Sequence, residues 1–326
     1  MTATIATKRP PTPRPGVYEL YWEFAAMRQA AFYSRLAGNA GPWSNDPILR
    51  EYKFCNVYRA ADRVSQYLIK NICYSDESLD KANRLFQIIV FRNFSKIETW
   101  EKLKNILGHT PTLDDLSSGN FESALTAITK RNQAIYTNAF ILCATDAYGR
   151  GRKHLNHIAM FQHMFFREDI ASEILSAASL QHVYEILHRF PLYGDFMSYQ
   201  TAIDINYSDL IDFSENDFTV AGPGAIRGIR KVFEDLGDYT PAEIILWMVE
   251  NQDKEFERLG ISFRNLFGRK IHAIDAQNLF CETDKYCRVR MPDLASSRKR
   301  IKTRFAPKNQ AIVMFFPPKW NLEINL

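Results

Sequence analysis

The 326 residues, 46% hydrophobic and 24% charged, have the composition of an ordinary globular protein, and no run of about 18 apolar residues could span a bilayer. The length allows a substantial core, which we expect to be divided between two fused lobes. The net charge of +4 is small, and five scattered cysteines without an export signal indicate reduced thiols in the cytoplasm rather than disulfides.

The N-terminal segment, residues 1–16, is expected to be a disordered tail. It has no apolar stretch of signal-peptide length, and four of the six residues 10–15 are prolines, which favour an extended chain over a helix. From residue 17 onward, apolar residues recur at helical spacing. We therefore expect a helical domain over residues 17–290, followed by a basic extension over residues 291–326.

Capping signals and apolar periodicity divide this domain into helices. The first helix runs from residue 17 to Gly38, and the second follows Asp46-Pro47 and continues to residue 72. Further helices are predicted at 77–92, 95–106, 121–127, 130–146, 152–164, 169–175 and 178–190, with turns at 108–120, 148–151, 191–194 and 221–224. The clearest strand candidate is AIVMFFPP at 311–318. The pattern predicts an all-α protein with little or no sheet.

Residues 179–207 predict a helical hairpin, in which a short turn with Pro191 and Gly194 precedes a second helix at about Asp195. Free amides at the start of that helix would face a phosphate, which the helix dipole also favours. Tyr193 at the tip could wedge a duplex or stack on an extruded base. The segment FPLYG at 190–194 resembles the L-P-G-x-G turn of the helix-hairpin-helix DNA glycosylase superfamily, with Leu192 in place of the first glycine.

Four segments carry a more specific resemblance. They are DPILREYKFCNVYRAADR at 46–63, YQTAIDINY at 199–207, GPGAIRG at 222–228 and FCETDKYCR at 280–288. In this order they look like the family of α-glutamyl/putrescinyl-thymine pyrophosphorylases. The resemblance implies a helix-hairpin-helix DNA glycosylase-like fold, with two helical lobes around a cleft.

The same resemblance implies work on hypermodified bases of phage DNA. The family includes helical domains fused to hydroxymethyluracil DNA kinases, amino-acid-to-DNA transferases, and an anti-phage glycosylase that removes glucosylated hydroxymethylcytosine. A P-loop kinase needs G-x-x-x-x-G-K-[ST] to hold phosphates and Mg²⁺, and the 326 residues lack this motif. The nearest segment, GRGRK at 149–153, has no serine or threonine after its lysine and is interpreted as a basic turn.

The catalytic carboxylate remains open between four candidates. The superfamily places an aspartate in the loop beyond the hairpin, but the aligned residue here is Gly222. A carboxylate that stabilises the cationic sugar and orients water must then come from another position. The candidates are Asp204 in the second helix of the hairpin, Asp62, Glu282 and Asp284.

Two groups of residues are expected to bind the substrate. Asn56, Arg59, Asp62 and Arg63 are spaced so that most of them share one helical face, which predicts a pocket wall or, alternatively, a solvated face or a buried ion pair. The remaining candidates are Tyr199 and Gln200 on the hairpin and Lys285, which could instead pair with Glu282 or Asp284. His154, His157 and His163 lack the spacing of a zinc hydrolase, and we expect no metal and no other cofactor.

The basic C-terminal segment is the expected DNA-binding surface. Between Arg288 and Lys308 it carries eight basic residues and a single acid, Asp293, a density that suits phosphate neutralisation. The full set of expected DNA-binding residues is Tyr193, Gly194, Gly222, Gly224, Arg227, Arg288, Arg298, Lys299, Arg300 and Lys302.

These observations favour a monomeric DNA glycosylase that flips a hypermodified pyrimidine out of double-stranded DNA, hydrolyses its N-glycosidic bond and thereby acts in anti-phage defence. Phe196 stands where related enzymes carry a nucleophilic lysine, which predicts an enzyme without lyase activity. The first alternative is a transferase that displaces phosphate or pyrophosphate from activated 5-hydroxymethyluracil in DNA with an amino acid or polyamine. The second alternative is a non-catalytic binder of modified DNA.

Overall fold

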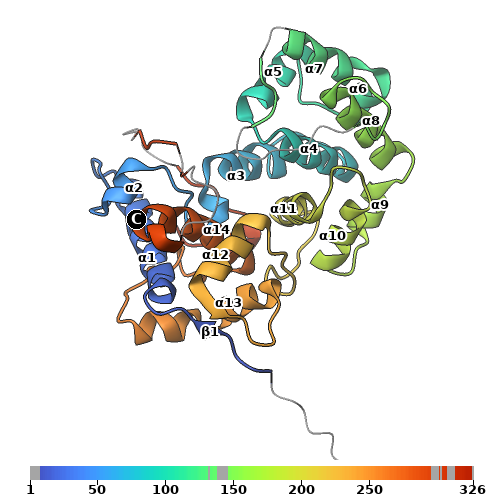
Figure 1. Cartoon of the computed structure of the whole chain (residues 1–326). Coiled ribbons are helices and arrows are strands. Elements are labelled where there is room, and N and C mark those ends of the chain that lie inside the picture. The colour runs from blue at the N-terminus through green and yellow to red at the C-terminus, as the bar shows by residue number, and fades with distance from the viewer. Residues whose placement is uncertain are drawn as a thin grey trace, which may run out of the picture. The chain divides into compact units, whose positions relative to one another are not determined.

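The computed structural model describes residues 8–130, 133–137, 146–294, 301, 303–306 and 313–324. Almost all regular structure is helical, which confirms the all-α prediction (Figure 1). The chain divides into two compact units. Unit 1 comprises residues 1–62, 218–314 and 320–326, and unit 2 comprises residues 63–217 and 315–319. Two lobes were expected, and a cleft between them stays a prediction.

Unit 1 is built around one long helix. Its elements are β1 (Thr12–Pro13), α1 (Val17–Leu36), α2 (Pro47–Glu51), the 3-10 turn η1 (Arg59–Ala61), α12 (Pro223–Val232), β2 (Phe233–Asp235), α13 (Pro241–Arg258), α14 (Ala273–Arg290) and the 3-10 turn η3 (Pro292–Leu294). Helix α14 contacts α1, α12 and α13. Aromatic rings fill the contact with α1, where Tyr21 and Phe280 lie 4.6 Å apart between ring centroids.

Residues 8–16 are not the disordered tail that the sequence predicted. Pro13 and Thr12 pair antiparallel with β2, and the Arg14 amide donates to the carbonyl of Val232 at 2.8 Å. A Cβ atom on Gly237 would lie 2.1 Å from the Arg9 carbonyl oxygen, so only glycine lets the two segments approach. The proline-rich chain lacks donors for a central strand, but it can pair along one edge of a two-stranded sheet.

All the regular elements of unit 2 in the described part of the chain are helices. Its elements are α3 (Arg63–Leu68), the π-helical turn η2 (Ile69–Cys73), α4 (Lys81–Phe94), α5 (Ile97–Leu107), α6 (Leu113–Ser118), α7 (Asn120–Lys130), α8 (Lys153–Phe166), α9 (Ile170–Leu175), α10 (Leu180–His188) and α11 (Asp195–Asn206). Helix α4 is buried along its length after Asn83 and contacts α5, α9 and α11, so it forms the core of this unit. A last 3-10 turn, η4 (Pro318–Trp320), contributes residues to both units.

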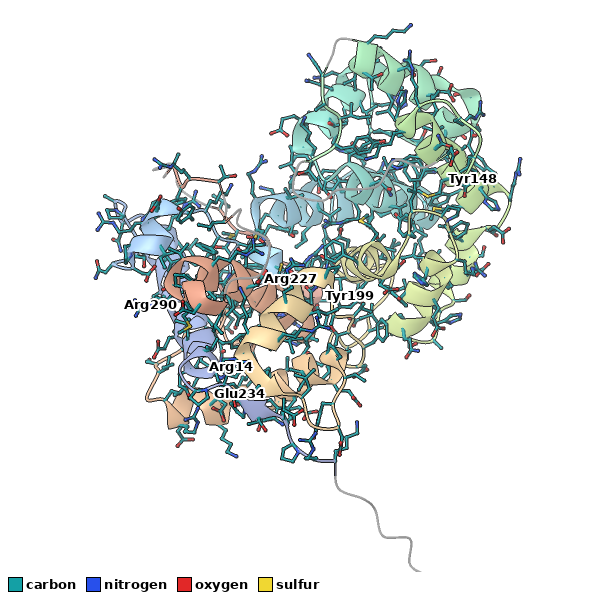
Figure 2. The ribbon with its side chains drawn as sticks, in the orientation of Figure 1. Arg14, Tyr148, Tyr199, Arg227, Glu234 and Arg290 are labelled. Carbon is teal, nitrogen blue, oxygen red and sulfur yellow. The ribbon has the colours of Figure 1, made fainter. Side chains whose placement is uncertain are left out.

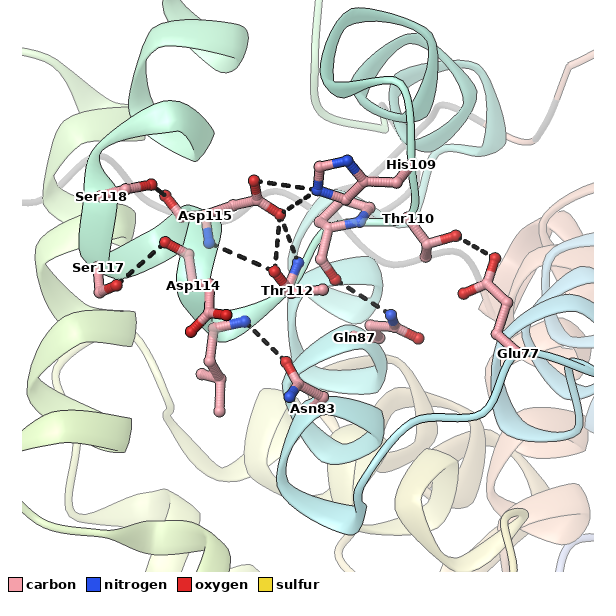
Figure 3. A network of polar contacts seen from close by, with 12 residues as sticks. Glu77, Asn83, Gln87, His109, Thr110, Thr112, Asp114, Asp115, Ser117 and Ser118 are labelled. Atoms are coloured by element: carbon pink, nitrogen blue, oxygen red, sulfur yellow. Dashed lines mark hydrogen bonds and ion pairs between the residues drawn. The ribbon is translucent and has the colours of Figure 1, made fainter.

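The predicted turn at 108–120 contains an additional short helix, α6. Its start is fixed by a capping box, in which the Thr112 amide donates to Asp115 Oδ2 at 2.9 Å and the Asp115 amide donates to Thr112 Oγ1 at 3.4 Å (Figure 3). His109 Nε2 lies 2.9 Å from the same carboxylate oxygen. Turn-forming residues at the start of the segment therefore act as a helix cap, which the sequence interpretation missed.

Two other predicted elements differ from the structure. The described part of AIVMFFPP, residues 313–318, contains no strand, since Phe315 donates its amide to the side chain of Gln66 and two prolines follow. Residues 133–137 of the predicted helix 130–146 are not helical, and most of the rest of that helix lies outside the described residues. Across the described chain, no helix combines the length and the apolar character needed to cross a membrane.

Candidate functional site on helix α14

Helix α14 carries the segment FCETDKYCR, whose apolar and charged side chains lie on different sides of the helix. Phe280 and Cys287 are fully buried in the core of unit 1. Successive residues of an α-helix are rotated by about 100°, so Asp284 and Arg288 lie on one side of the helix, whereas Glu282 lies about 160° around the axis from Asp284, with Lys285 between them. We call these four residues the charged face of α14. All four were predicted as catalytic, substrate-binding or DNA-binding residues, and on α14 they form two ion pairs, Glu282 with Lys285 and Asp284 with Arg288.

Two glycines let α12 pack closely against α14 (Figure 1). A Cβ atom on Gly228 would lie 2.0 Å from the backbone oxygen of Phe280, and one on Gly224 would lie 2.4 Å from Cys281 Sγ. Gly224 therefore packs on one side against α14, and contact of its backbone with DNA stays a prediction. Gly222 is buried at the N-cap position of α12. In the segment GPGAIRG, Gly224 and Gly228 therefore serve the packing of α12 against α14.

Asp284 is fully buried and is shared among three cations. Its carboxylate lies 2.9 Å from Lys231 Nζ and 3.2 Å from Arg227 Nε, and it also pairs with the guanidinium of Arg288. Burial alone would raise the pKa of Asp284, but hydrogen bonds and charge from Lys231 and Arg288 outweigh it and lower the pKa below the ordinary value. Asp284 is therefore ionised, and its single charge serves three positive groups.

The three cations differ in how far solvent reaches them. The side chains of Lys231 and Arg288 are 7% and 6% exposed, whereas that of Arg227 is 25% exposed. Figure 2 labels Arg227 on α12. Arg227 and Arg288 were predicted to bind DNA from the surface. Arg288 is instead a buried partner of Asp284, and Arg227 is the member of this cluster that a ligand can reach.

Glu282 forms a second ion pair on the same helix. Its Oε1 lies 2.7 Å from Lys285 Nζ, and its Oε2 accepts the backbone amide of Cys55 at 3.1 Å. Burial lowers the pKa of Lys285, but the charge of Glu282 and its hydrogen bond outweigh burial and raise the pKa above the ordinary value. Lys285 therefore stays charged, and Glu282 is held by both a side chain and a backbone donor.

Arg28 of α1 completes this part of the site. It is buried and donates from Nη1 to the Cys55 carbonyl at 2.8 Å. Burial lowers the pKa of Arg28, and the negative charges of Glu282 and Asp62 oppose that shift. Together with the charged face of α14, Arg28, Arg227 and Lys231 make a cation-rich site within unit 1.

Asn56, Arg59, Asp62 and Arg63 do not share a helical face, and that expectation is wrong. The Asn56 amide donates to Asp62 Oδ1 at 2.9 Å, and Asn56 Nδ2 donates to the Ala61 carbonyl at 2.8 Å. Side chain to backbone bonds of this kind compete with helical ones, and the predicted helix 47–72 is broken between α2 and α3. Asn56 and Asp62 therefore face each other across a turn.

The turn between Asn56 and Asp62 is hydrogen-bonded to α14, whereas Arg63, the last of the four predicted residues, lies in unit 2. The Arg59 amide donates to Asp275 Oδ1 at 2.8 Å, in the first turn of α14. Arg63 begins α3 in unit 2, where it is exposed and lies 3.6 Å from Glu98. Asn56, Arg59 and Asp62 thus belong to the same unit as the charged face of α14, and a substrate-binding role for them stays a prediction.

The predicted helical hairpin is present as α10 and α11, which lie side by side (Figure 1). Leu192, which replaces the first glycine of the resembled turn, has a φ of 76°, the left-handed conformation that suits glycine. The expectation that Tyr193 lies at an exposed tip is wrong, because its ring is 1% exposed and its hydroxyl accepts Asn93 Nδ2 at 2.7 Å. Burial raises the pKa of Tyr193 to about 12.

Gly194 is exposed at the N-cap position of α11, but the next residue opposes phosphate binding there. Asp195 carries its own negative charge at the positive end of the helix dipole, where it lies 3.5 Å from His188 Nε2 and accepts the Tyr184 hydroxyl at 3.1 Å. DNA binding by this turn stays a prediction, with an acid already occupying the favourable position.

Asp204 is a structural residue of unit 2 in this conformation. It is fully buried and pairs with Arg92 of α4, which is 3% exposed. A buried carboxylate needs such a partner, and the pair joins α11 to α4. Tyr199 and Gln200 on the same helix are also buried, and substrate binding by them stays a prediction. Burial and the pair with Arg92 favour a structural role for Asp204 over the predicted catalytic one.

Most of the basic C-terminal segment cannot be compared with its prediction, because Arg298, Lys299, Arg300 and Lys302 lie outside the described residues. The described residues 303–305 run antiparallel to residues 51–53 of unit 1. The Lys53 amide donates to the Thr303 carbonyl at 2.9 Å, and the Phe305 amide donates to the Glu51 carbonyl at 2.8 Å. This part of the segment is anchored on unit 1.

Sequence reasoning missed Arg28 and Lys231. Each is a cation in a helix whose neighbouring residues are largely apolar, and a cation at such a position needs a buried carboxylate. That signal was available in the sequence, but Asp284, which pairs with Lys231, and Glu282, whose charge acts on Arg28, lie far away along the chain in FCETDKYCR. His154 and His157, considered for metal binding, bond instead to Thr126 and Tyr136.

Comparison with known proteins identifies the family. A family model described as the helical domain of 5-hmdU DNA kinase matches residues 15–296. The chain belongs to this family. The match includes most of both units and all of the cation-rich site, and it ends before Arg298, the first of the basic residues outside the described part of the chain. It confirms the resemblance to proteins of hydroxymethyluracil modification, but it does not extend that resemblance to glycosylases.

The chain is also similar in sequence to a phage 5-hmdU DNA kinase. The 5-hmdU DNA kinase of Bacillus phage SP10 is 27% identical over 299 residues, which cover 86% of this chain and 46% of the relative. The chain therefore spans about half the length of that relative. No solved structure matches the chain.

Proposed function

We propose that this protein acts on a modified thymine in DNA, as a transferase that joins an amine to an activated 5-hydroxymethyluracil base. The family and the relative both carry the name of an enzyme for 5-hydroxymethyluracil in DNA. The single observation that carries the proposal is the charged face of α14, where Asp284 is shared among three cations beside a Glu282–Lys285 pair.

A cation-rich site of this kind suits a phosphorylated substrate. Arg227 bonds to Asp284 through Nε, and its side chain is 25% exposed, so it can approach a phosphate while Asp284 fixes its position. Lys285 is 23% exposed and remains charged. Both can neutralise charge on a departing phosphate or pyrophosphate, which is the usual way that proteins assist such a leaving group.

The proposed reaction is a displacement at the exocyclic methylene carbon of the base. The nitrogen of a neutral amine attacks that carbon, the carbon–oxygen bond to the phosphate breaks, and phosphate or pyrophosphate leaves with the bonding electrons. The new nitrogen–carbon bond leaves a proton in excess on nitrogen. We propose that this proton passes to Glu282, which accepts hydrogen bonds from Lys285 and the Cys55 amide.

Neither glycoside hydrolysis nor P-loop phosphoryl transfer has comparable support. The comparisons name a hydroxymethyluracil enzyme and no glycosylase, and the glycosylase hypothesis relied in part on Asp204, which is buried against Arg92. The 326 residues hold no P-loop motif, so the kinase reaction named for the relative is not proposed for this chain.

The test is to incubate the purified protein with a duplex containing 5-(pyrophosphoryloxymethyl)uracil and either glutamate or putrescine. Nucleoside mass spectrometry should detect an amine-linked thymine, with release of one pyrophosphate for each amine incorporated. A matched duplex with ordinary thymine should give neither product. Release of free base with abasic sites would support hydrolysis instead, and tight binding without any product would support a reader of modified DNA.

A further inference from the structure

Unit 2 contains a cavity of about 260 Å³ with both polar and apolar walls. Its lining residues come from the end of η2, from the segment that leads into α4, from α4 itself and from the residues directly after α11. Leu79 and Leu210 supply apolar contacts, whereas most of the other lining side chains carry hydroxyl groups or charges. Pockets for drug-sized ligands span about 300–1,000 Å³, so this cavity suits a smaller molecule or group.

Arg84 on α4 is a buried cation in the wall of this cavity. It is 8% exposed, and its Nη2 donates to the Glu77 carbonyl at 2.9 Å while its Nη1 donates to the Ile72 carbonyl and to the Ser75 hydroxyl. All three acceptors are neutral, and within the described chain no carboxylate lies within ion-pair distance of the guanidinium. A buried charge normally has a partner of opposite sign, because its removal from water is costly. The wall of the cavity therefore favours an anionic ligand.

Three side chains around the cavity can donate hydrogen bonds to such an anion. The Tyr74 hydroxyl is buried, and it has no hydrogen-bond partner in the described part of the chain. The Ser75 hydroxyl accepts from Arg84, which leaves its own proton for another acceptor. Lys81 is exposed, and none of the described carboxylates is within ion-pair distance of its ammonium group. A phosphate group, with several acceptor oxygens and a negative charge, matches two hydroxyl donors and an ammonium group.

Asp209 adds a requirement for the other end of the ligand. It is exposed, lines the same cavity, and forms no ion pair with a cation of the described chain. Its carboxylate accepts hydrogen bonds and repels a bare anion, so it favours a ligand that also has a hydroxyl or amino group. With Lys81 and Arg84 as the two cations, the lining keeps an excess of positive charge.

We propose that this cavity binds a phosphate monoester that carries a hydroxyl or amino group within reach of Asp209. The phosphate oxygens accept hydrogen bonds from Lys81 and from the Tyr74 and Ser75 hydroxyls. Arg84 fixes Ser75 and adds its charge. A free sugar phosphate and the 5′-phosphorylated end of a DNA strand share this chemistry. No residue of the cavity belongs to the cation-rich site of unit 1, so the inference is independent of the proposed function.

The experiment follows the thermal unfolding of the full chain against the concentration of deoxyribose 5-phosphate, of inorganic phosphate, and of a short oligonucleotide with or without a 5′ phosphate. A ligand that binds the folded protein raises its unfolding temperature once the ligand concentration exceeds the dissociation constant. Deoxyribose 5-phosphate should stabilise the protein at lower concentrations than inorganic phosphate, and both should exceed sodium chloride at equal ionic strength. A larger effect of the 5′-phosphorylated oligonucleotide than of the free sugar phosphate and the unphosphorylated strand would identify a DNA end as the source of the phosphate.

Two variants assign the binding to this cavity. Lys81→Met should raise the dissociation constant for deoxyribose 5-phosphate about tenfold, as expected for the loss of a hydrogen bond between charged groups. Tyr74→Phe should also weaken binding, but it should not lower the unfolding temperature without ligand, because the hydroxyl that it removes is buried without a partner among the described residues. The matched control is Lys70→Met, which removes an exposed charge of η2 outside the lining and should change the dissociation constant less than twofold.

A third variant, Asp209→Asn, tests the requirement for a hydroxyl or amino group. It should remove the preference for deoxyribose 5-phosphate over inorganic phosphate, while the affinity for inorganic phosphate stays the same or rises. If no phosphate ligand stabilises the wild type more than sodium chloride does, or if Lys81→Met binds as tightly as Lys70→Met, the inference is overturned. Neither result changes the expected amine transfer, which is measured in its own assay.

Discussion

Replacing Gly228 with alanine should separate α12 from α14. The new Cβ atom would lie 2.0, 2.6 and 3.1 Å from the oxygen, carbonyl carbon and Cα of Phe280, all of them backbone atoms that cannot rotate away. Overpacking of this kind costs about 1–3 kcal/mol, and the better helix propensity of alanine returns at most about 1 kcal/mol. Separation of the helices also lengthens the contacts of Lys231 with Asp284. We expect a net loss of about 2–3 kcal/mol in the free energy of unfolding.

The measurement is urea unfolding followed by circular dichroism, with two comparison variants. Gly151→Ala adds a Cβ atom that meets nothing within 4 Å and should leave stability within about 0.5 kcal/mol of the wild type. The Cβ atom of Gly224→Ala would lie 2.4 Å from Cys281 Sγ, so adding Cys281→Ala should restore much of the stability that Gly224→Ala loses. Adding Cys281→Ala to Gly228→Ala should not restore its stability. A Gly228→Ala protein as stable as the wild type would refute the close approach of the two helices.

Three further predictions concern charge and backbone strain. Asp284→Asn should lower the free energy of unfolding by about 3 kcal/mol near neutral pH, measured by urea unfolding. Because the fold lowers the pKa of Asp284, this difference from the wild type should shrink as pH falls below the ordinary aspartate value of 3.8. The control, Asp293→Asn at an exposed position, should show neither effect. Leu192→Val should lower the thermal midpoint, at a cost of about 1 kcal/mol or more, because a β-branched residue tolerates a φ of 76° poorly, whereas Leu192→Asn should not. Asp204→Asn should reduce the thermal midpoint by leaving Arg92 without its buried carboxylate, while the folded fraction keeps its rate of amine transfer; a selective loss of rate would return Asp204 to catalysis.

Helices with strong caps and continuous apolar spacing could be predicted from the sequence. The hairpin of α10 and α11 was found because Ser179 starts one helix, Gly194 starts the next and the turn between them is short. The break between α2 and α3 was missed, because it depends on hydrogen bonds from Asn56 and Asp62 to backbone atoms within the segment. Local propensity does not reveal which side chain will take such a bond.

The candidate site was predicted in its composition and not in its geometry. Glu282, Asp284 and Lys285 were singled out from one charged segment, and each proved to be part of an ion pair. Lys231, which pairs with Asp284, lies on another helix, and the close approach of the two helices depends on Gly228, whose packing role was not predicted. Non-local pairing of this kind follows from helix packing, which a single sequence does not display.

The charged face of α14 as the site of reaction can be tested by replacing the Glu282–Lys285 pair as a unit. The double variant Glu282→Gln, Lys285→Met removes both charges together, which avoids leaving one of them buried alone. The control is Glu255→Gln, Arg258→Met, which removes an ion pair of the same spacing from α13. With the activated uracil duplex, the account predicts at least about a hundredfold slower amine transfer for the first variant, unchanged duplex affinity, and a normal rate for the control. Equal transfer rates in the two variants would contradict it.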